Sequence, residues 1–172
     1  VFLAPAAVSE LLGIISWGGV SMGDHQRGNG SFKDLWDKKK KLSTKFSLTE
    51  DFSLGMGPRF NDRGEVSPIN LPLIKNGELE NFLTSTRTSN EYKVESNFAS
   101  DGEGMRSPVI SNGKLARENF LKELDTGLYL SNLHYLNWSD RETARLTGMT
   151  RYACFWVEKG EIMAPIEDLR FD

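Results

Sequence analysis

The chain has 172 residues, 38% of them hydrophobic, which is enough for a folded domain with a sizeable core. No run approaches the roughly 18 to 20 apolar residues of a membrane-spanning helix, so a membrane partner is excluded. The net charge of −3 argues against a nucleic-acid partner, because phosphate contacts require concentrated Lys and Arg. A single cysteine, Cys154, excludes an internal disulfide and is typical of a reducing compartment, so we expect a cytoplasmic protein.

The first predicted element is a helix from Ala4 to Ser16, where apolar residues recur at i, i+3, i+4 and i+7. The glycine-rich tract from Met22 to Ser31 lacks the lysine and hydroxyl of a phosphate-binding loop, so we interpret it as a polar loop. A second helix is expected from Ser31 to Leu42. It carries the basic run Lys38–Lys41, which we interpret as a solvated helix face paired with two preceding aspartates.

The middle of the chain is dominated by strand patterns. Alternation predicts a half-buried strand from Lys45 to Asp51, and further short strands are expected at Tyr92–Ser96 and Pro108–Asn112. Between them, Leu71–Leu83 is predicted to be a hairpin, because Asn76-Gly77 suits a type I′ turn with positive φ at both positions.

The last part combines one helix with a second hairpin. Spacing predicts a helix from Arg117 to Asp125, followed by final strands at Thr147–Ala153, Cys154–Glu158 and Glu161–Ile166. The terminal hairpin has the same layout as Leu71–Leu83, so we expect both in one sheet system. The sequence thus predicts a single α+β domain over residues 1–172, with a mixed, mainly antiparallel sheet curled into a barrel-like shape and about three packed helices.

No catalytic motif is found in these residues. The only histidines, His25 and His134, lie far apart in the sequence, and neither belongs to a zinc-binding H-E-x-x-x-H pattern. There is no G-x-S-x-G elbow, and Cys154 lies in an apolar run that is typical of a small core residue. We therefore assign no catalytic residue, no metal ligand and no cofactor to this chain.

The last quarter of the sequence also carries a recognisable pattern, in which an aromatic strand and a glycine turn are followed by Pro and Arg-Phe. It consists of Gly148, Arg151, Phe155–Ile162, Pro165-Ile166 and Arg170-Phe171. This ending resembles that of the TldD/PmbA family, once described as modulators of DNA gyrase and regarded as metalloprotease subunits. The resemblance extends more loosely over the whole chain and implies a C-terminal domain whose N-terminal domain is absent here, in keeping with a start at Val1 rather than Met.

The resemblance implies a part in proteolysis or maturation of extended peptides, with this domain forming cleft walls and a subunit interface. TldD-type subunits carry the zinc motif before this domain, whereas PmbA-type partners lack it, so zinc is expected only in the full-length protein or its partner subunit. The implied partners are a peptide substrate and a second TldD/PmbA-type subunit, in a homo- or heterodimer. The sequence leaves open whether the parent protein is an enzyme.

Within this resemblance, Gly104 and Arg106 correspond to a G-x-x-x-R loop near the peptide cleft and are the candidate substrate-binding residues. The competing interpretation is that Ser100–Ser107 is an ordinary surface loop, since loops of either kind are rich in glycine and charge. Two alternative functions remain: a noncatalytic, peptide-binding partner that acts only through association, and a stand-alone small-molecule-binding barrel suggested by the glycine loops alone.

Overall fold

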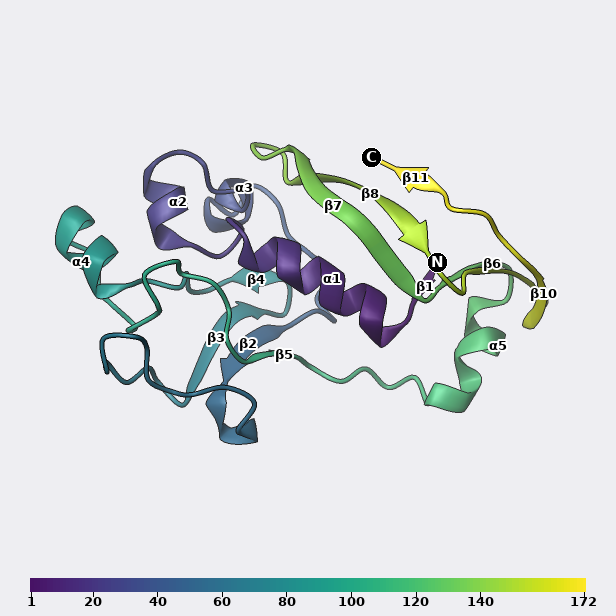
Figure 1. Cartoon of the computed structure of the whole chain (residues 1–172), viewed down its shortest axis with the longest axis horizontal. Helices are drawn as coiled ribbons and strands as arrows, with labels where there is room; N and C mark the ends of the chain where they lie inside the picture. Colours follow the sequence, from purple (N-terminus) through teal and green to yellow (C-terminus); the bar gives the residue numbers. More distant parts are fainter. The chain divides into compact units, whose positions relative to one another are not determined.

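The structure is a computed structural model that describes every residue from Val1 to Asp172, and the chain forms two compact units. Unit 1 contains Val1–Ile14, Gly113–Asp140 and Arg145–Asp172, and unit 2 contains Ile15–Asn112 and Arg141–Ala144. Helices and strands occur in both units, which confirms the α+β class (Figure 1). No helix in the structure is both long and apolar enough to cross a bilayer.

Unit 1 is built mainly from strands, in two open sheets. The four-stranded sheet has the order β1-β6-β9-β10, and the three-stranded sheet has the order β11-β8-β7. Figure 1 shows β7 and β8 as a long twisted hairpin with β11 beside β8. The strands are β1 (Phe2–Leu3), β6 (Gly127–Leu130), β7 (Asn132–Asp140), β8 (Arg145–Arg151), β9 (Phe155–Glu158), β10 (Glu161–Pro165) and β11 (Arg170–Phe171).

The core of unit 1 lies between these sheets and the first turns of α1 (Pro5–Ser16). Ala7, Leu130, Leu133 and Cys154 are buried together, with Phe171 packed against them. Cys154 therefore occupies the core position that the sequence predicts. The predicted helix at 117–125 is present in part, as a 3-10 turn η2 (Arg117–Asn119) that leads into α5 (Phe120–Leu124).

Unit 2 contains one four-stranded antiparallel sheet in the order β4-β3-β2-β5. Its buried apolar side chains include Val20, Leu48, Leu73, Ile74 and Phe82. The strands are β2 (Leu48–Asp51), β3 (Asn70–Lys75), β4 (Glu78–Leu79) and β5 (Pro108–Ile110). The helices are α2 (Met22–Gln26), α3 (Lys33–Trp36), α4 (Thr86–Tyr92) and the 3-10 turn η1 (Phe52–Leu54).

The barrel-like shape and the count of three helices are wrong. All three sheets are open, and there are five α-helices, because the loop expected at Met22–Ser31 contains α2 and the polar segment before residue 93 forms α4. The two similar hairpins do not share a sheet: β3-β4 belongs to unit 2 and β9-β10 to unit 1. The strand expected at Tyr92–Ser96 is also absent, since α4 ends at Tyr92 and irregular backbone follows.

The basic run Lys38–Lys41 does not lie on a helix either. α3 ends at Trp36, and Lys38 has a φ of 57°, which breaks the helix before the run begins. The lysines still pair with acidic side chains: Lys40 with Asp34 at 3.3 Å, and Lys41 with Glu78 at 2.5 Å. The run thus forms exposed surface ion pairs, as expected, but it does so outside a helix and without the predicted i,i+4 spacing.

Candidate functional site

The loop from Ser100 to Ser107 is the second half of the connection between α4 and β5 in unit 2, and it contains both predicted substrate-binding residues. The Arg106 side chain is engaged within the chain: its guanidinium donates to the Phe60 carbonyl at 2.9 Å and to the Ser67 hydroxyl at 2.5 Å. It also lies 4.9 Å from the centre of the Phe52 ring. The structure therefore places Arg106 where it fastens the 58–67 segment, and its contact with a substrate stays a prediction.

Gly104 lies next to the end of α1. A side chain at this position would have its Cβ 3.2 Å from the Ser16 hydroxyl, and the next amide, that of Met105, donates to the same hydroxyl at 2.7 Å. The close approach of the backbone to Ser16 is a physical reason for glycine at residue 104. Gly104 and Arg106 thus belong to one loop, and both take part in anchoring it.

Glu103, a residue of the same loop that the sequence did not single out, is only 2% exposed. Its carboxylate accepts from the Ser21 hydroxyl at 2.6 Å, the Gly23 amide at 2.7 Å and the Ser85 amide at 2.8 Å. Burial raises the pKa of this carboxyl, but the hydrogen bonds from Ser21, Ser85, Thr88 and Gly23 outweigh burial, so the pKa lies below its usual value.

Glu103 is held where two short helices begin. Ser21 caps α2 by accepting from the Asp24 amide at 3.0 Å, and Ser85 caps α4 by accepting from the Thr88 amide at 3.1 Å. Amides in these first turns have no partner within their helices, so an anionic oxygen satisfies them. The only sequence signal was the single serine ahead of each helix, and it did not indicate that one distant glutamate contacts both serines.

A second buried carboxylate, Glu50 on β2, holds the other end of the loop. It accepts from the Arg106 amide at 3.0 Å and from the Ser107 amide at 3.1 Å, and it is 2% exposed. Burial raises the pKa of Glu50, and the two amides with the nearby guanidinium only partly oppose the rise. Glu103 from the middle of the loop and Glu50 from β2 together hold the loop in place, so it is a rigid part of unit 2.

Two hollows in unit 2 lie close to this network. The first, of about 420 Å³, is polar and has Trp17, Arg27, Arg87 and Glu103 among its lining residues. Some of the charged side chains that line it neutralise one another: Arg27 forms an ion pair with Asp24 at 2.9 Å. A hollow with charges of both signs suits a polar ligand but does not select one.

The second hollow, of about 470 Å³, has aromatic and amide walls. Trp36 and Phe82 line it, and their ring centres are 5.0 Å apart. Its Asn97 side chain is fixed, donating to the Phe82 carbonyl at 2.7 Å and accepting from the Thr84 amide at 2.9 Å. The walls are thus held in place by hydrogen bonds within the chain.

The rim of the aromatic hollow is the irregular segment 94–98. The backbone amides of Glu95 and Ser96 on this rim donate no hydrogen bond within the chain. Open amides beside an aromatic wall are the groups that an extended peptide would use: its carbonyls accept from the amides while a side chain packs on the rings. This makes the aromatic hollow the better candidate for a peptide contact.

The two histidines and the cysteine do not come together. His25 belongs to unit 2, where its ring stacks on Phe82 at 4.7 Å, whereas His134 and the buried Cys154 belong to unit 1. The Nδ1 atom of His25 is buried without a hydrogen-bond partner. Burial lowers the pKa of the His25 ring; the charge of Asp37 opposes this shift and the charge of Lys33 adds to it. An aromatic surrounding offers no second ligand, and no group of three or more His, Cys, Asp or Glu in the chain could hold a metal ion. The residues present therefore do not fit a zinc site.

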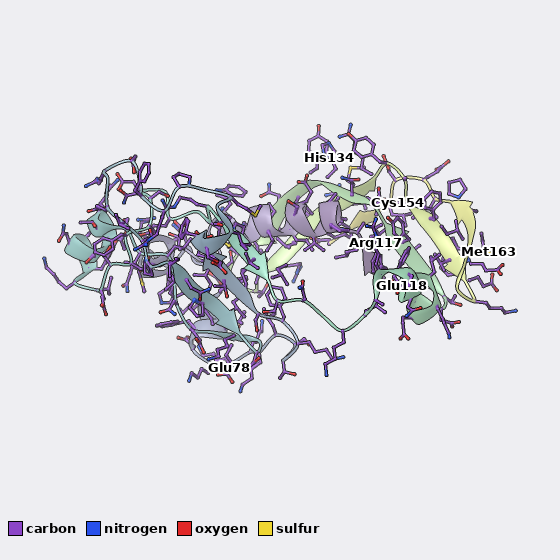
Figure 2. The ribbon with its side chains drawn as sticks, turned by 90° about the horizontal axis from the view of Figure 1, so that it is seen from below. Glu78, Arg117, Glu118, His134, Cys154 and Met163 are labelled. Carbon is purple, nitrogen blue, oxygen red and sulfur yellow. The ribbon has the colours of Figure 1, made fainter.

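In unit 1, the outermost strand β10 is open to solvent along its length. All five of its residues are exposed, with Ile162 at 50% and Met163 at 58%. β10 pairs only with β9, so its outer edge carries no further strand. Figure 2 shows the Met163 side chain at the margin of unit 1. Exposed apolar side chains on an open edge are typical of an interaction surface.

Comparison with known proteins gives a consistent result. The family model described as "PmbA/TldA metallopeptidase C-terminal domain" matches residues 1–172. No curated protein matched in a direct sequence search.

Among solved structures, the fold is similar to that of a proposed DNA gyrase modulator from Thermotoga maritima (TM-score 0.75, 20% identity) and another from Bacteroides thetaiotaomicron (TM-score 0.80, 15% identity). It is also similar to TldE from Thermococcus kodakarensis (TM-score 0.71, 19% identity). These matches cover 99%, 99% and 93% of this chain but only 40%, 38% and 38% of the other chains.

Proposed function

This chain belongs to the PmbA/TldA metallopeptidase family and corresponds to the family's C-terminal domain. From that premise we propose that it is part of a peptidase subunit that acts on extended peptides. In this proposal the domain contributes a wall of the peptide cleft and a subunit contact. The metal and the bond-breaking chemistry belong to another domain or to a partner subunit, because the residues here offer no zinc site.

The aromatic hollow of unit 2 is the observation that carries the peptide part of the proposal. A protein that accepts varied sequences gains most from backbone hydrogen bonds, because every residue carries the same N–H and C=O groups. The unpaired amides of Glu95 and Ser96 supply the donors, and the rings of Trp36 and Phe82 supply an unselective apolar surface. The rigid loop with Glu103 keeps the neighbouring segments in place without using binding energy.

The subunit contact in this proposal is β10 of unit 1. Its open edge provides backbone groups, and Ile162 and Met163 provide apolar area. The alternative function, a noncatalytic partner that acts by association alone, needs only this edge and no peptide contact in unit 2.

The peptide contact can be tested by NMR titration of the chain with an unlabelled, neutral, unstructured decapeptide. We expect shifts of the Trp36 indole and of the amides from 94 to 98, and roughly fivefold weaker binding in Trp36→Ala, since an aromatic contact contributes about 1 kcal/mol.

Trp156→Ala is the matched control, because the two indoles are similarly exposed (37% for Trp156 and 39% for Trp36) and Trp156 lies in unit 1. Shifts confined to unit 1, or none at any peptide concentration, would contradict the peptide contact and leave the association function.

A further inference from the structure

The outer face of the three-stranded sheet in unit 1 carries a group of cations that the function proposed above does not use. We call it the arginine face and define it by His134, Tyr135, Met149, Arg151 and Arg170. Two of these residues, Arg151 and Arg170, belong to the terminal pattern on which the family resemblance rests. The face therefore contains recognisable sequence features with no role so far.

Strand register places these side chains on one face. Arg170 of β11 pairs with Met149 of β8, and Met149 pairs in turn with His134 of β7. Directly paired residues point to the same side of a sheet, and Arg151 follows Met149 by two positions, so it points there too. With strands about 4.8 Å apart, Arg170 and His134 are about 10 Å apart across the sheet.

The opposite face of the same sheet is the core face. Leu133 and Phe171 point inward and belong to the apolar core of unit 1, and Gly148 makes room for Phe171, whose ring would lie 2.7 Å from an added Cβ. Because successive side chains of β8 alternate between the two faces of the sheet, Met149 and Arg151 point away from the core. Figure 2 shows His134 at the upper margin of unit 1, above Cys154.

The cations of this face have no anionic partner. Arg170 and Arg151 form no ion pair, although Asp168 and Asp172 flank Arg170 in the sequence. Instead, Nη1 of Arg151 contacts Nε2 of His134, and its guanidinium lies 5.0 Å from the centre of the Tyr152 ring. These contacts orient Arg151 without neutralising it, in a chain whose net charge is negative.

A hollow of about 270 Å³ opens beside these cations. It is lined by Tyr135, Thr147, Gly148, Met149 and Arg170. Tyr135 lies where the pairing of β7 with β8 shifts register, with a φ of 50° and a side chain that is 76% exposed. Such a backbone costs about 1 kcal/mol or more for a residue with a Cβ, and an exposed ring regains little of it by burial. The ring is instead available to a ligand in the hollow.

We propose that the arginine face binds an extended acidic segment of a polypeptide, with one carboxylate in the hollow beside Arg170 and another near Arg151. A planar guanidinium matches a carboxylate with two parallel hydrogen bonds, and the Tyr135 ring packs on the aliphatic part of the acidic side chain. Two separated arginines fit successive carboxylates better than one terminal carboxylate.

The inference does not rest on the peptide contact in unit 2. It concerns other residues, and the one occupant it assigns to them is an extended acidic peptide segment. The peptide used to test the aromatic hollow is neutral, so failure of either proposal leaves the other standing.

The probe is a fluorescein-labelled decapeptide of alternating Ala and Glu, measured by anisotropy with the 172-residue chain at low salt. A peptide with Gln in place of Glu is the neutral counterpart, and we expect it to bind at least roughly tenfold more weakly, as is typical for loss of charge-assisted hydrogen bonds. Arg170→Gln is expected to weaken binding of the acidic peptide roughly tenfold, and Arg151→Gln somewhat less. Added salt should weaken binding of the acidic peptide to the parent chain, because it screens the charges.

The matched control is Arg117→Gln. Arg117 is an exposed arginine of the same unit that lies away from His134 in Figure 2, so its loss changes the net charge equally and should leave affinity unchanged. Equal binding of the Glu and Gln peptides, or equal losses in Arg170→Gln and Arg117→Gln, would overturn the proposal. Displacement of the probe by millimolar phosphate but not by acetate would assign the face to phosphate and overturn it as well.

Tyr135→Gly separates binding from folding. Glycine adopts a positive φ at no steric cost, so the thermal midpoint should not fall, while affinity for the acidic peptide should drop severalfold because the ring is lost. An unchanged affinity would remove Tyr135 and its hollow from the site.

Discussion

Two hairpins with the same sequence layout, Ile74–Leu79 and Val157–Ile162, occupy different units and have different surroundings. Both turns are of the same type, since φ is 50° and 80° at Asn76 and Gly77, and 52° and 78° at Lys159 and Gly160. Yet the first hairpin ends in Leu79, which is buried, whereas the second continues into β10, which is exposed throughout.

The surroundings of the two turn glycines differ in the same way. A Cβ on Gly77 would lie 2.3 Å from the Leu42 carbonyl oxygen, because residues 42–46 pass over this turn and exchange hydrogen bonds with Gly77. A Cβ on Gly160 would meet nothing closer than 3.4 Å, at the Lys122 Cα. The residues of a turn thus set its local geometry, and chain segments far away in the sequence set how tightly it is packed.

The largest expected effect is that of alanine at the two turn glycines. Gly160→Ala should cost about 1 to 2 kcal/mol, the cost of a Cβ at positive φ, whereas Gly77→Ala should cost about 3 to 4 kcal/mol because the backbone of Leu42 must also move. Urea denaturation of each variant measures the difference. Equal losses in the two variants would mean that residues 42–46 do not press on the first turn.

A smaller effect is expected at the last apolar residue of each hairpin. Leu79→Ala should cost about 2 to 3 kcal/mol, because a buried side chain leaves a cavity. Ile162→Ala should change stability by less than about 0.5 kcal/mol, as is usual for exposed positions. In sedimentation experiments, however, Ile162→Ala should weaken any self-association through β10. A large loss of stability in Ile162→Ala would show that β10 is covered rather than open.

The smallest effect concerns pH and the buried carboxylates of unit 2, which have no counterpart in the core of unit 1. The raised pKa of Glu50 gives a stabilisation that is fully present below the pKa of the unfolded chain and is lost as pH rises through the folded pKa. Glu50→Gln should therefore gain stability relative to the parent as pH rises from 3 to 7.

Glu103 should behave in the opposite way. Its lowered pKa gives a stabilisation that is present above the unfolded pKa and is lost as pH falls through the folded pKa. The deficit of Glu103→Gln should thus be greatest near pH 7 and shrink in acid, and urea midpoints across this range measure both trends. Exposed Glu80→Gln serves as the control, and parallel pH profiles for Glu50→Gln and Glu103→Gln would contradict the opposite shifts.

Much of the secondary structure could be predicted where the signal is local. The Asn76-Gly77 turn, the helix from residue 5 and the terminal hairpin follow from φ preferences and apolar spacing, which neighbouring residues decide. The prediction failed for α2 and α4, which are only one to two turns long and hold no apolar repeat. Their serine caps and the distant Glu103 stabilise them, and spacing along the chain cannot reveal such a partner.

The sequence by itself determined the α+β class, the burial of Cys154, the two turns and the membership of a family, because these depend on composition and on residues close together in the chain. Only the tertiary structure decided that there are two units with three open sheets, that Glu103 and Glu50 hold one loop, and that His134, Arg151 and Arg170 share a face. Each of these depends on a pairing between distant segments, and such a pairing is set by the packing of the whole chain rather than by any local preference.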